Sequence, residues 1–268
     1  MTEKSDDQQG PPVADMEALV LRAREFMGRM AGMAGMAKTR QTPFSPDELR
    51  SRFALTPRGV KKPEVILAED CFVELGHPST ASVSTVLVTY RPDLVHHGDV
   101  TVAGPDIPDM AAGERRALGQ VILVAVDPVV VPDPFSLENA QYLMHRLPGW
   151  MVRAVPGRLW VRVGRRQKTA GLSLWAVGSA LAVTLMEDFP GVSAAEVLFV
   201  TSGQKDVAAL EQLALEASIL SGKHKKLVLG MDGEVECSEL ACDTCDEKPV
   251  CDNLRDVVVK RRKARKRK

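Results

Sequence analysis

The spacing of apolar residues divides the chain into helix-like and strand-like stretches. Between Asp15 and about Lys38, apolar side chains recur every three or four residues, which predicts a helix with one buried stripe. A capping box at Ser45–Glu48, with a proline at the first helical position, predicts a short helix after it. Four later stretches are rich in Val, Ile, Leu and Thr, are separated by turn residues and predict strands: Glu64–Leu75, Ser84–Tyr90, Asp99–Ala103 and Gly119–Val126.

The second half of the chain alternates the two patterns. Helices are predicted over Pro134–Leu147, over the largely apolar Leu172–Phe189, over Val207–Leu220 and from near Asp252. Strands are predicted over Trp150–Ala154, Leu159–Val163 and Glu196–Thr201. This order favours an α+β fold, with mixed sheets packed with helices and a cysteine-rich metal-binding C-terminal segment beyond them. We expect a disordered N-terminus over 1–14, a helical region over 15–60, an α+β domain over 61–230, a cysteine-rich segment over 231–259 and a basic tail over 260–268.

Four of the five cysteines fall within fifteen residues, with the spacing C-x4-C-x2-C-x5-C. They are Cys237, Cys242, Cys245 and Cys251. Thiolates this close together can saturate one metal centre, and a chain of 268 residues has enough core to fold without disulfides. No secretory signal precedes residue 30, which favours a reducing, cytoplasmic compartment and disfavours disulfides further. We therefore predict that these four cysteines bind a metal.

The spacing favours a 4Fe–4S cluster over zinc. Structural zinc usually takes two C-x2-C pairs separated by a longer loop. Here one tight pair is flanked on each side by a single cysteine, and such a compact wrap suits the corners of a cubane cluster. Pro249, just before the last cysteine, resembles the turns that pack against such clusters. Zinc stays the alternative, and Cys71, in a predicted strand, is expected to be a core residue.

Charge is balanced over the whole chain but concentrated at one end. The 35 basic and 35 acidic residues, with 45% hydrophobic residues, indicate a globular protein of one or two domains. The sequence contains no run of about 18 apolar residues that would span a membrane. From Lys260 to Lys268 every residue except Ala264 is basic, which attracts a polyanion or simply aids solubility. His96 and His97 fall in a predicted turn and are expected to be surface residues.

Several weak motifs occur in an order that is more specific than any one of them. They are Glu74-Leu-Gly-His-Pro78 with Ser82 and Ser84, Asp99 through Gly104-Pro105-Asp106-Ile107, Leu159-Trp-Val-Arg-Val163 through Gly171 to Phe189-Pro190, and Ala195-Glu-Val-Leu-Phe-Val-Thr201. Together they resemble the acetyl-CoA synthase family, the β subunit of the carbon monoxide dehydrogenase complex. The likeness runs from about Glu64 to the first cysteines. It implies the fold of that family more firmly than its activity.

The sequence departs from the family in the spacing of the cysteines that would bind the metal. The family's active site is a nickel–iron–sulfur cluster, with a C-x2-C pair, two more widely spaced cysteines and a later Cys-x-Cys pair that holds the second nickel. No Cys-x-Cys pair occurs in this sequence, so a square-planar nickel site has no ligands to use. The resemblance therefore implies an iron–sulfur site with Cys237, Cys242, Cys245 and Cys251 as its candidates.

Arginines and tryptophans gather in the central region, at Arg153, Arg158, Trp160 and Arg162. In the family that the chain resembles, basic and tryptophan residues of the central region help to hold coenzyme A. Guanidinium groups bind phosphates bidentately and an indole can stack on adenine, so these four residues are candidates for coenzyme A binding. The alternation in Trp160-Val-Arg-Val also fits an exposed strand whose other residues belong to the core.

We expect an iron–sulfur protein of anaerobic one-carbon or acetyl-CoA metabolism. It would transfer electrons or assemble with subunits of a carbon monoxide dehydrogenase or corrinoid-type complex, or with a ferredoxin. A second hypothesis is an acetyl-CoA synthase-type acyltransferase with an atypical cluster, although a cube with four cysteine ligands has no vacant position for substrate. A third is a zinc or iron–sulfur nucleic-acid-binding module, because the tail is basic.

Overall fold

The computed structural model describes residues 13–33, 35–60, 65–142, 146–155 and 158–220, and two short strands at 228–229 and 235–236. Contacts divide the chain into two units, Met1–Ser221 and Gly222–Lys268. In the second unit, β10 (Val228–Leu229) pairs with β11 (Val235–Glu236) in antiparallel orientation. The domain boundaries expected at residues 60 and 230 stay predictions.

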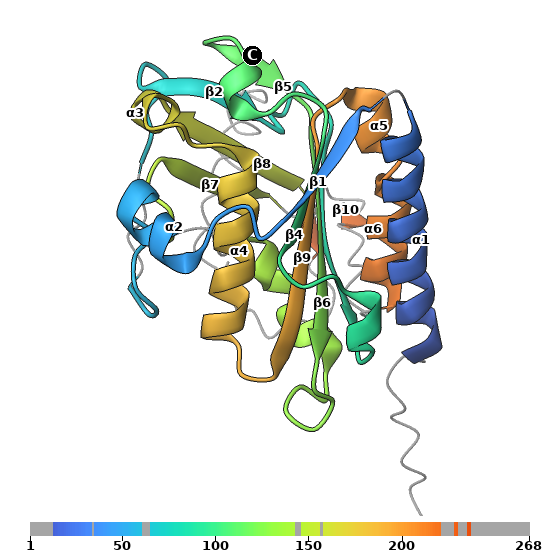
Figure 1. Ribbon diagram of the computed structural model, residues 1–268. Coiled ribbons are helices and arrows are strands. Elements are labelled where there is room, and N and C mark those ends of the chain that lie inside the picture. The colour runs from blue at the N-terminus through green and yellow to red at the C-terminus, as the bar shows by residue number, and fades with distance from the viewer. Residues whose placement is uncertain are drawn as a thin grey trace, which may run out of the picture. The chain divides into compact units, whose positions relative to one another are not determined.

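A five-stranded mixed sheet forms the centre of the first unit (Figure 1). Its strands lie in the order β1 (Ala37–Gln41), β4 (Asp99–Ala103), β9 (Val192–Val200), β6 (Leu118–Val126) and β3 (Ser82–Thr89). The β4–β9 and β3–β6 pairs are parallel, and the β1–β4 and β6–β9 pairs are antiparallel. All nine residues of β6 are buried. A strand buried on both faces needs apolar residues throughout, which explains its unbroken hydrophobic run.

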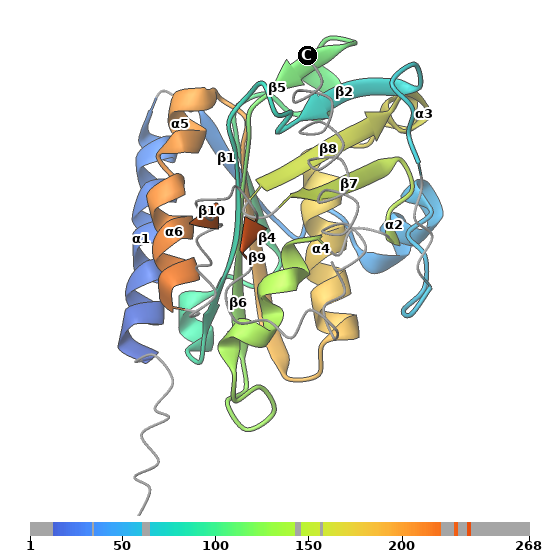
Figure 2. The same cartoon turned by 180° about the vertical axis from the view of Figure 1, so that it is seen from behind.

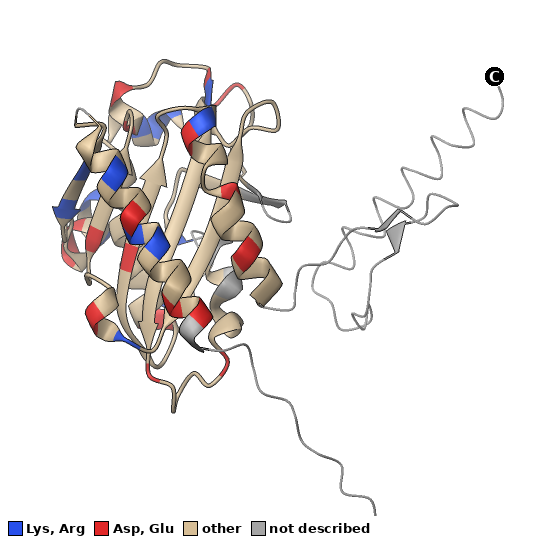
Figure 3. Ribbon diagram, turned by 90° about the vertical axis from the view of Figure 1, so that its right-hand side faces the viewer, with Lys and Arg blue, Asp and Glu red and all other residues tan. Residues whose placement is uncertain are grey.

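Helices α1 (Val13–Gly32), α5 (Gln204–Ala208) and α6 (Glu211–Leu220) cover one face of this sheet (Figures 1 and 2). On that side Leu19 and Phe26 of α1 share a hydrophobic cluster with Val121 and Leu123 of β6. Acidic and basic residues are interleaved along α1 (Figure 3), α6 carries the acidic Glu211 and Glu216, and Arg22 and Glu216 form an ion pair between the two helices. This surface therefore suits contact with water.

A second, four-stranded sheet and helix α4 (Leu174–Asp188) lie on the other face (Figure 2). The strand order is β5 (Glu114–Arg116), β2 (Cys71–Leu75), β8 (Arg158–Gly164) and β7 (Trp150–Val155). Helix α2 (Pro46–Phe53), helix α3 (Arg165–Thr169) and the 3-10 segments η1 (Pro92–Leu94), η2 (Ile107–Asp109) and η3 (Pro134–Tyr142) complete the described elements of this unit.

One glycine allows helix α4 to pack closely on the five-stranded sheet, and two side chains cap the N-terminus of the helix. A Cβ added to Gly178 would lie 2.5 Å from Val100 Cγ1, so only glycine allows this approach. At the N-terminus of the helix, Ser173 Oγ accepts from the Ala176 N–H, and Asp106 Oδ1 accepts from the Leu174 N–H at 2.6 Å. Asp106 belongs to the Gly-Pro-Asp-Ile motif, which thus has a structural role.

The described residues confirm the predicted mixed sheets packed with helices, while the predicted cysteine-rich segment and the helix near Asp252 lie outside them. The capping box at Ser45 and Glu48 is present, and strand Asp99–Ala103 has the predicted bounds. The long first helix was predicted wrongly beyond Gly32, because Ala37–Gln41 forms the edge strand β1. Gly35 adopts φ +74° in the turn between them, which a helix cannot continue through.

Two further predictions were wrong in type or extent. The helix expected over Pro134–Leu147 is a 3-10 segment over its described residues Pro134–Tyr142. The helix expected over Val207–Leu220 is divided into α5 and α6. Among the described helices, none combines the length and the hydrophobicity that a bilayer span requires.

Candidate functional site

Two polar clusters, each built around a buried glutamate, interrupt the apolar packing of the first unit. The Glu74 cluster lies on the four-stranded sheet and consists of Glu74, His77, Arg115, Trp160 and Arg162. The Glu196 cluster lies at one end of strands β4 and β9 and consists of Arg24, His96, Asp99 and Glu196. In each cluster a buried glutamate meets at least one arginine.

Strand register assembles the Glu74 cluster. Glu74 of β2 lies opposite Arg162 of β8 on one side and opposite Arg115 of β5 on the other. Residues opposite each other in a sheet project from the same face, so both guanidinium groups reach the carboxylate. Arg162 Nε donates to Glu74 Oε1 at 2.8 Å, and Arg115 Nε donates to Oε2 at 3.0 Å. His77 Nε2 lies 3.7 Å from the same Oε2.

Arg162 and Trp160 come from the same strand, two residues apart, and therefore share a face. The Arg162 guanidinium lies over the Trp160 ring at 5.1 Å from its centroid and donates from Nη1 to the carbonyl of Ile66 at 3.1 Å. The His77 ring meets the indole edge-on, with 5.4 Å between the ring centroids. The cluster thus joins a cationic group to an aromatic surface, an arrangement that can recognise an anion with a flat ring.

The two arginines keep Glu74 ionised. Burial acts to raise the pKa of its carboxyl group, but hydrogen bonds from Arg162 and Arg115 outweigh burial and lower the pKa below its ordinary value of 4.5. Two guanidinium groups face one carboxylate, so the cluster carries an excess positive charge.

The Glu-Leu-Gly-His-Pro motif also holds the two sheets of the first unit together. Gly76 adopts φ +64°, and a Cβ there would lie 2.1 Å from the carbonyl oxygen of Leu159. Ser82, at the start of β3, donates from Oγ to that oxygen at 2.8 Å and accepts from the Leu159 N–H at 2.9 Å. The close approach of two backbone segments therefore explains Gly76 and Ser82, whereas Glu74 and His77 of the same motif belong to the Glu74 cluster.

Of the four candidates for coenzyme A binding, the structure brings Trp160 and Arg162 into contact. Arg153 lies opposite Trp160 in the β7–β8 register and Arg158 lies opposite Val155, and the structure describes these two arginines by their backbone alone. The predicted alternation in β8 is confirmed, because Leu159, Val161 and Val163 are fully buried. A role of these residues in coenzyme A binding stays a prediction.

The four predicted metal ligands, Cys237, Cys242, Cys245 and Cys251, lie outside the described residues. Four thiolates within one short segment supply a donor set that suits a 4Fe–4S cluster or zinc. Cys71 is buried beside Ile66 and Met151, which confirms it as a core residue.

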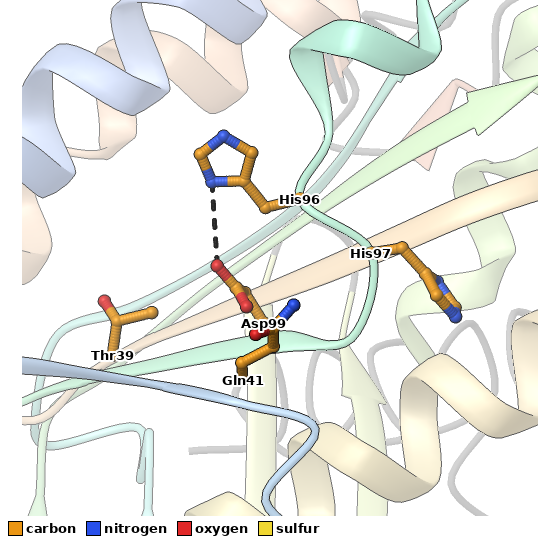
Figure 4. A pocket seen from close by; sticks show the side chains of 5 residues that line it. All are labelled: Thr39, Gln41, His96, His97 and Asp99. Carbon is orange, nitrogen blue, oxygen red and sulfur yellow. Dashed lines mark ion pairs between the residues drawn. The ribbon is translucent and has the colours of Figure 1, made fainter.

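The Glu196 cluster borders an open pocket of about 440 Å³ lined by Thr39, Gln41, His96, His97 and Asp99 (Figure 4). The His96 ring stands over Asp99, with 3.6 Å between Nδ1 and Oδ2, whereas His97 points away from this pair. Both histidines are exposed, as predicted from their turn. Gln41 lies opposite Asp99 in the β1–β4 register, so the edge strand completes the pocket.

Glu196, whose carboxylate lies close to His96 and Asp99, is 1% exposed. Its Oε2 accepts from the His96 N–H at 2.9 Å and from Arg24 Nη2 at 2.6 Å. Arg24 also donates from Nε to the Leu94 carbonyl at 2.6 Å, and its Nη1 lies 3.3 Å from His96 Nδ1. Burial raises the pKa of the Glu196 carboxyl, although the His96 N–H and the charge of Arg24 act against it.

Sequence reasoning missed the Glu196 cluster. Its members come from helix α1, the turn before β4, and strands β4 and β9, so only the fold brings them together. One signal was available, because Glu196 is a lone charged residue within the apolar run Ala-Glu-Val-Leu-Phe-Val. A charged residue in a fully buried strand needs a partner.

Three beta subunits of acetyl-CoA decarbonylase/synthase complexes are similar to this chain. Acetyl-CoA decarbonylase/synthase complex subunit beta of Methanothermobacter thermautotrophicus is 30% identical over 156 residues, which is 56% of this chain and 31% of the relative. The corresponding subunit of Archaeoglobus fulgidus is 24% identical over 57% of this chain and 29% of the relative. Subunit beta 2 of Methanosarcina thermophila is 27% identical over 58% of this chain and 32% of the relative. The chain thus spans about three tenths of the length of these relatives.

A family profile described as CO dehydrogenase/acetyl-CoA synthase complex beta subunit matches residues 60–206. This match covers 147 of the 268 residues and includes most of both sheets, helix α4 and the residues of the Glu74 cluster. The matched range contains all the motifs that indicated the resemblance. The chain belongs to the CO dehydrogenase/acetyl-CoA synthase complex beta subunit family.

Proposed function

We propose that this chain is an iron–sulfur component of an acetyl-CoA synthase-type complex, in which it transfers electrons or holds other subunits. The observation that carries this proposal is the group of four cysteines within fifteen residues, which follows the family-matching region in the sequence. Cys237, Cys242, Cys245 and Cys251 would hold one 4Fe–4S cluster. Its partners would be carbon monoxide dehydrogenase or corrinoid-type subunits, or a ferredoxin.

Ligand number favours a carrier of electrons over a catalyst. Chemistry at a metal requires a coordination position that the protein leaves open, and four cysteines fill the four corners of a cubane cluster. An acyltransferase with an atypical cluster is thus the weaker alternative. A zinc site on the same four thiolates is the other alternative. The acidic residues around the cysteines would add negative charge near either metal.

Metal analysis of anaerobically purified protein tests the proposal. We expect about four irons and four sulfides per chain, as a cubane cluster requires. Replacing any one of the four cysteines by serine should impair retention of the cluster, whereas Cys71→Ser is the matched control because Cys71 is buried elsewhere in the chain. Stoichiometric zinc without sulfide would disprove the iron–sulfur proposal. A new electron paramagnetic resonance signal on adding carbon monoxide would favour the acyltransferase.

The Glu74 cluster supports a second, separate proposal, the binding of coenzyme A. The contact between Trp160 and Arg162, with Arg115 nearby, offers an aromatic surface beside positive charge. Titration with coenzyme A should quench the tryptophan fluorescence of the native protein. The quenching should be smaller in Trp160→Phe. Trp150→Phe is the control, because Trp150 is buried in the core. Equal quenching of native protein and Trp160→Phe would exclude this cluster as the binding site.

A further inference from the structure

We propose that His96, Asp99 and Glu196 bind a divalent cation that accepts nitrogen and oxygen ligands, such as Mn²⁺. One ligand atom from each residue lies within 4.8 Å of the other two. The distance of 3.6 Å between His96 Nδ1 and Asp99 Oδ2 is close to the separation of two ligands that each lie about 2.1 Å from one ion. One imidazole and two carboxylates form a common donor set for divalent transition metals.

The surroundings of the three residues give an ion a way in and further ligands. His96 and Asp99 line the open pocket (Figure 4), while Glu196 is 1% exposed. The pocket of about 440 Å³ holds an ion together with several waters. Gln41 and Thr39 line the same pocket and offer an amide and a hydroxyl oxygen. A metal with three protein ligands and a solvent-filled side would therefore draw these ligand atoms, now within 4.8 Å of one another, to about 4.2 Å or less.

Charge explains why a cation is favoured here and why its binding is weak. Two carboxylates, Asp99 and Glu196, face one guanidinium, that of Arg24, so the cluster carries an excess negative charge when His96 is neutral. Glu196 is buried, and an additional cation would offset the desolvation of its carboxylate. Arg24 competes with the ion, because it holds Glu196 Oε2 and lies next to His96 Nδ1. We expect a dissociation constant on the order of 0.1 mM.

This site is chemically distinct from the four-cysteine segment. Oxygen and imidazole ligands suit Mn²⁺, whereas thiolates select iron–sulfur clusters, zinc and copper. The two sites can therefore be tested separately in the full chain by choosing a metal that thiolates bind poorly. The result for one site also leaves the proposal for the other intact.

Titration of the full-length protein with Mn²⁺ tests the inference, because free Mn²⁺ gives an electron paramagnetic resonance signal that is lost on binding. Native protein should bind about one Mn²⁺ per chain, and Asp99→Asn and His96→Ala should each weaken binding about ten-fold or more. The matched control is His97→Ala, which removes the neighbouring histidine that points away from Asp99 and should bind as native protein does.

A substitution that acts in the opposite direction guards against effects of misfolding. Arg24→Gln removes the competing positive charge but retains an amide donor, so it should strengthen Mn²⁺ binding several-fold. Circular dichroism of each variant verifies that it is folded. Equal binding by native protein and Asp99→Asn, the absence of binding below about 1 mM, or weaker binding by Arg24→Gln would each overturn the inference.

Discussion

Glu74 and Glu196 are both buried glutamates paired with arginine, yet the pKa of the first is lowered and that of the second is raised. Their exposed fractions are 9% and 1%, and Glu74 accepts hydrogen bonds from two arginines whereas Glu196 is paired with one. Burial penalises both charged forms, and it does so more strongly at the more deeply buried Glu196, whereas hydrogen bonds from two guanidinium groups outweigh it at Glu74. Interactions thus favour the ionised carboxylate of Glu74 on the four-stranded sheet, whereas burial disfavours that of Glu196 on the five-stranded sheet.

The largest effect is expected from removing the principal partner of Glu74. Arg162→Met leaves a buried carboxylate with the exposed Arg115 and with His77, and it also removes the bond to the Ile66 carbonyl. The free energy of unfolding at neutral pH should fall by about 2–3 kcal/mol, less than the about 3–5 kcal/mol expected when a buried charge loses its partner, because Arg115 still pairs with Glu74. Urea denaturation measures it. If Arg162→Met and Arg115→Met lower the free energy of unfolding by the same amount, Arg162 is not the dominant partner of Glu74.

The corresponding change at Glu196 should have a smaller effect that depends on pH. Arg24→Met removes its guanidinium partner, but burial already favours the neutral carboxyl group, so protonation can relieve part of the cost. We expect the free energy of unfolding to fall by about 1–2 kcal/mol near neutral pH and by less near pH 5. Denaturation with a metal chelator present isolates the ion pair from metal binding. A cost that grows as the pH falls would contradict this account.

The two glutamates should give pH dependences of opposite sign. The lowered pKa of Glu74 means that its contribution to stability is present above its ordinary value of 4.5 and is lost as pH falls through the lower, folded value. The raised pKa of Glu196 means that its contribution is present below 4.5 and is lost as pH rises through the higher, folded value. Glu74→Gln should therefore be less stable than the native protein at neutral pH and approach its stability in acid. Glu196→Gln should become more stable relative to the native protein as pH rises. Each difference in the free energy of unfolding should be up to about 1 kcal/mol.

Denaturation of both variants over about pH 3 to 8 checks these signs. Parallel curves for native protein and Glu196→Gln would show that its carboxyl group has no shifted pKa. The same result for Glu74→Gln would show that the two arginines do no more than balance burial.

The smallest effect is expected at the exposed partner of Glu74. The Arg115 side chain is 56% exposed, so water screens its interaction with the carboxylate. Arg115→Met should change the free energy of unfolding by no more than about 0.5 kcal/mol, provided that Arg162 remains in place. A cost similar to that of Arg162→Met would mean that the two arginines act as one unit, which a double variant would reveal as non-additivity.

Much of the fold could be predicted because local patterns agree with the tertiary structure. The capping box at Ser45, strand Asp99–Ala103 and the apolar helix that became α4 each carry their own signal. Edge strand β1 carries none, since its five residues Ala-Lys-Thr-Arg-Gln are polar after the first and form a strand only by pairing with β4. The Pro134–Tyr142 segment has a helical pattern, yet it forms a 3-10 segment packed against β3.

The sequence by itself determined the family, the mixed sheets and the alternation that buries Val161 and exposes part of Arg162, because these depend on residue order and on the two-residue period of a strand. The tertiary structure alone decided which charges meet. Glu74 and Arg162 are 88 residues apart in sequence, and Arg24 and Glu196 are 172 apart. No local pattern encodes such pairings, since they follow from the register of β2 on β8 and from the packing of α1 on the five-stranded sheet.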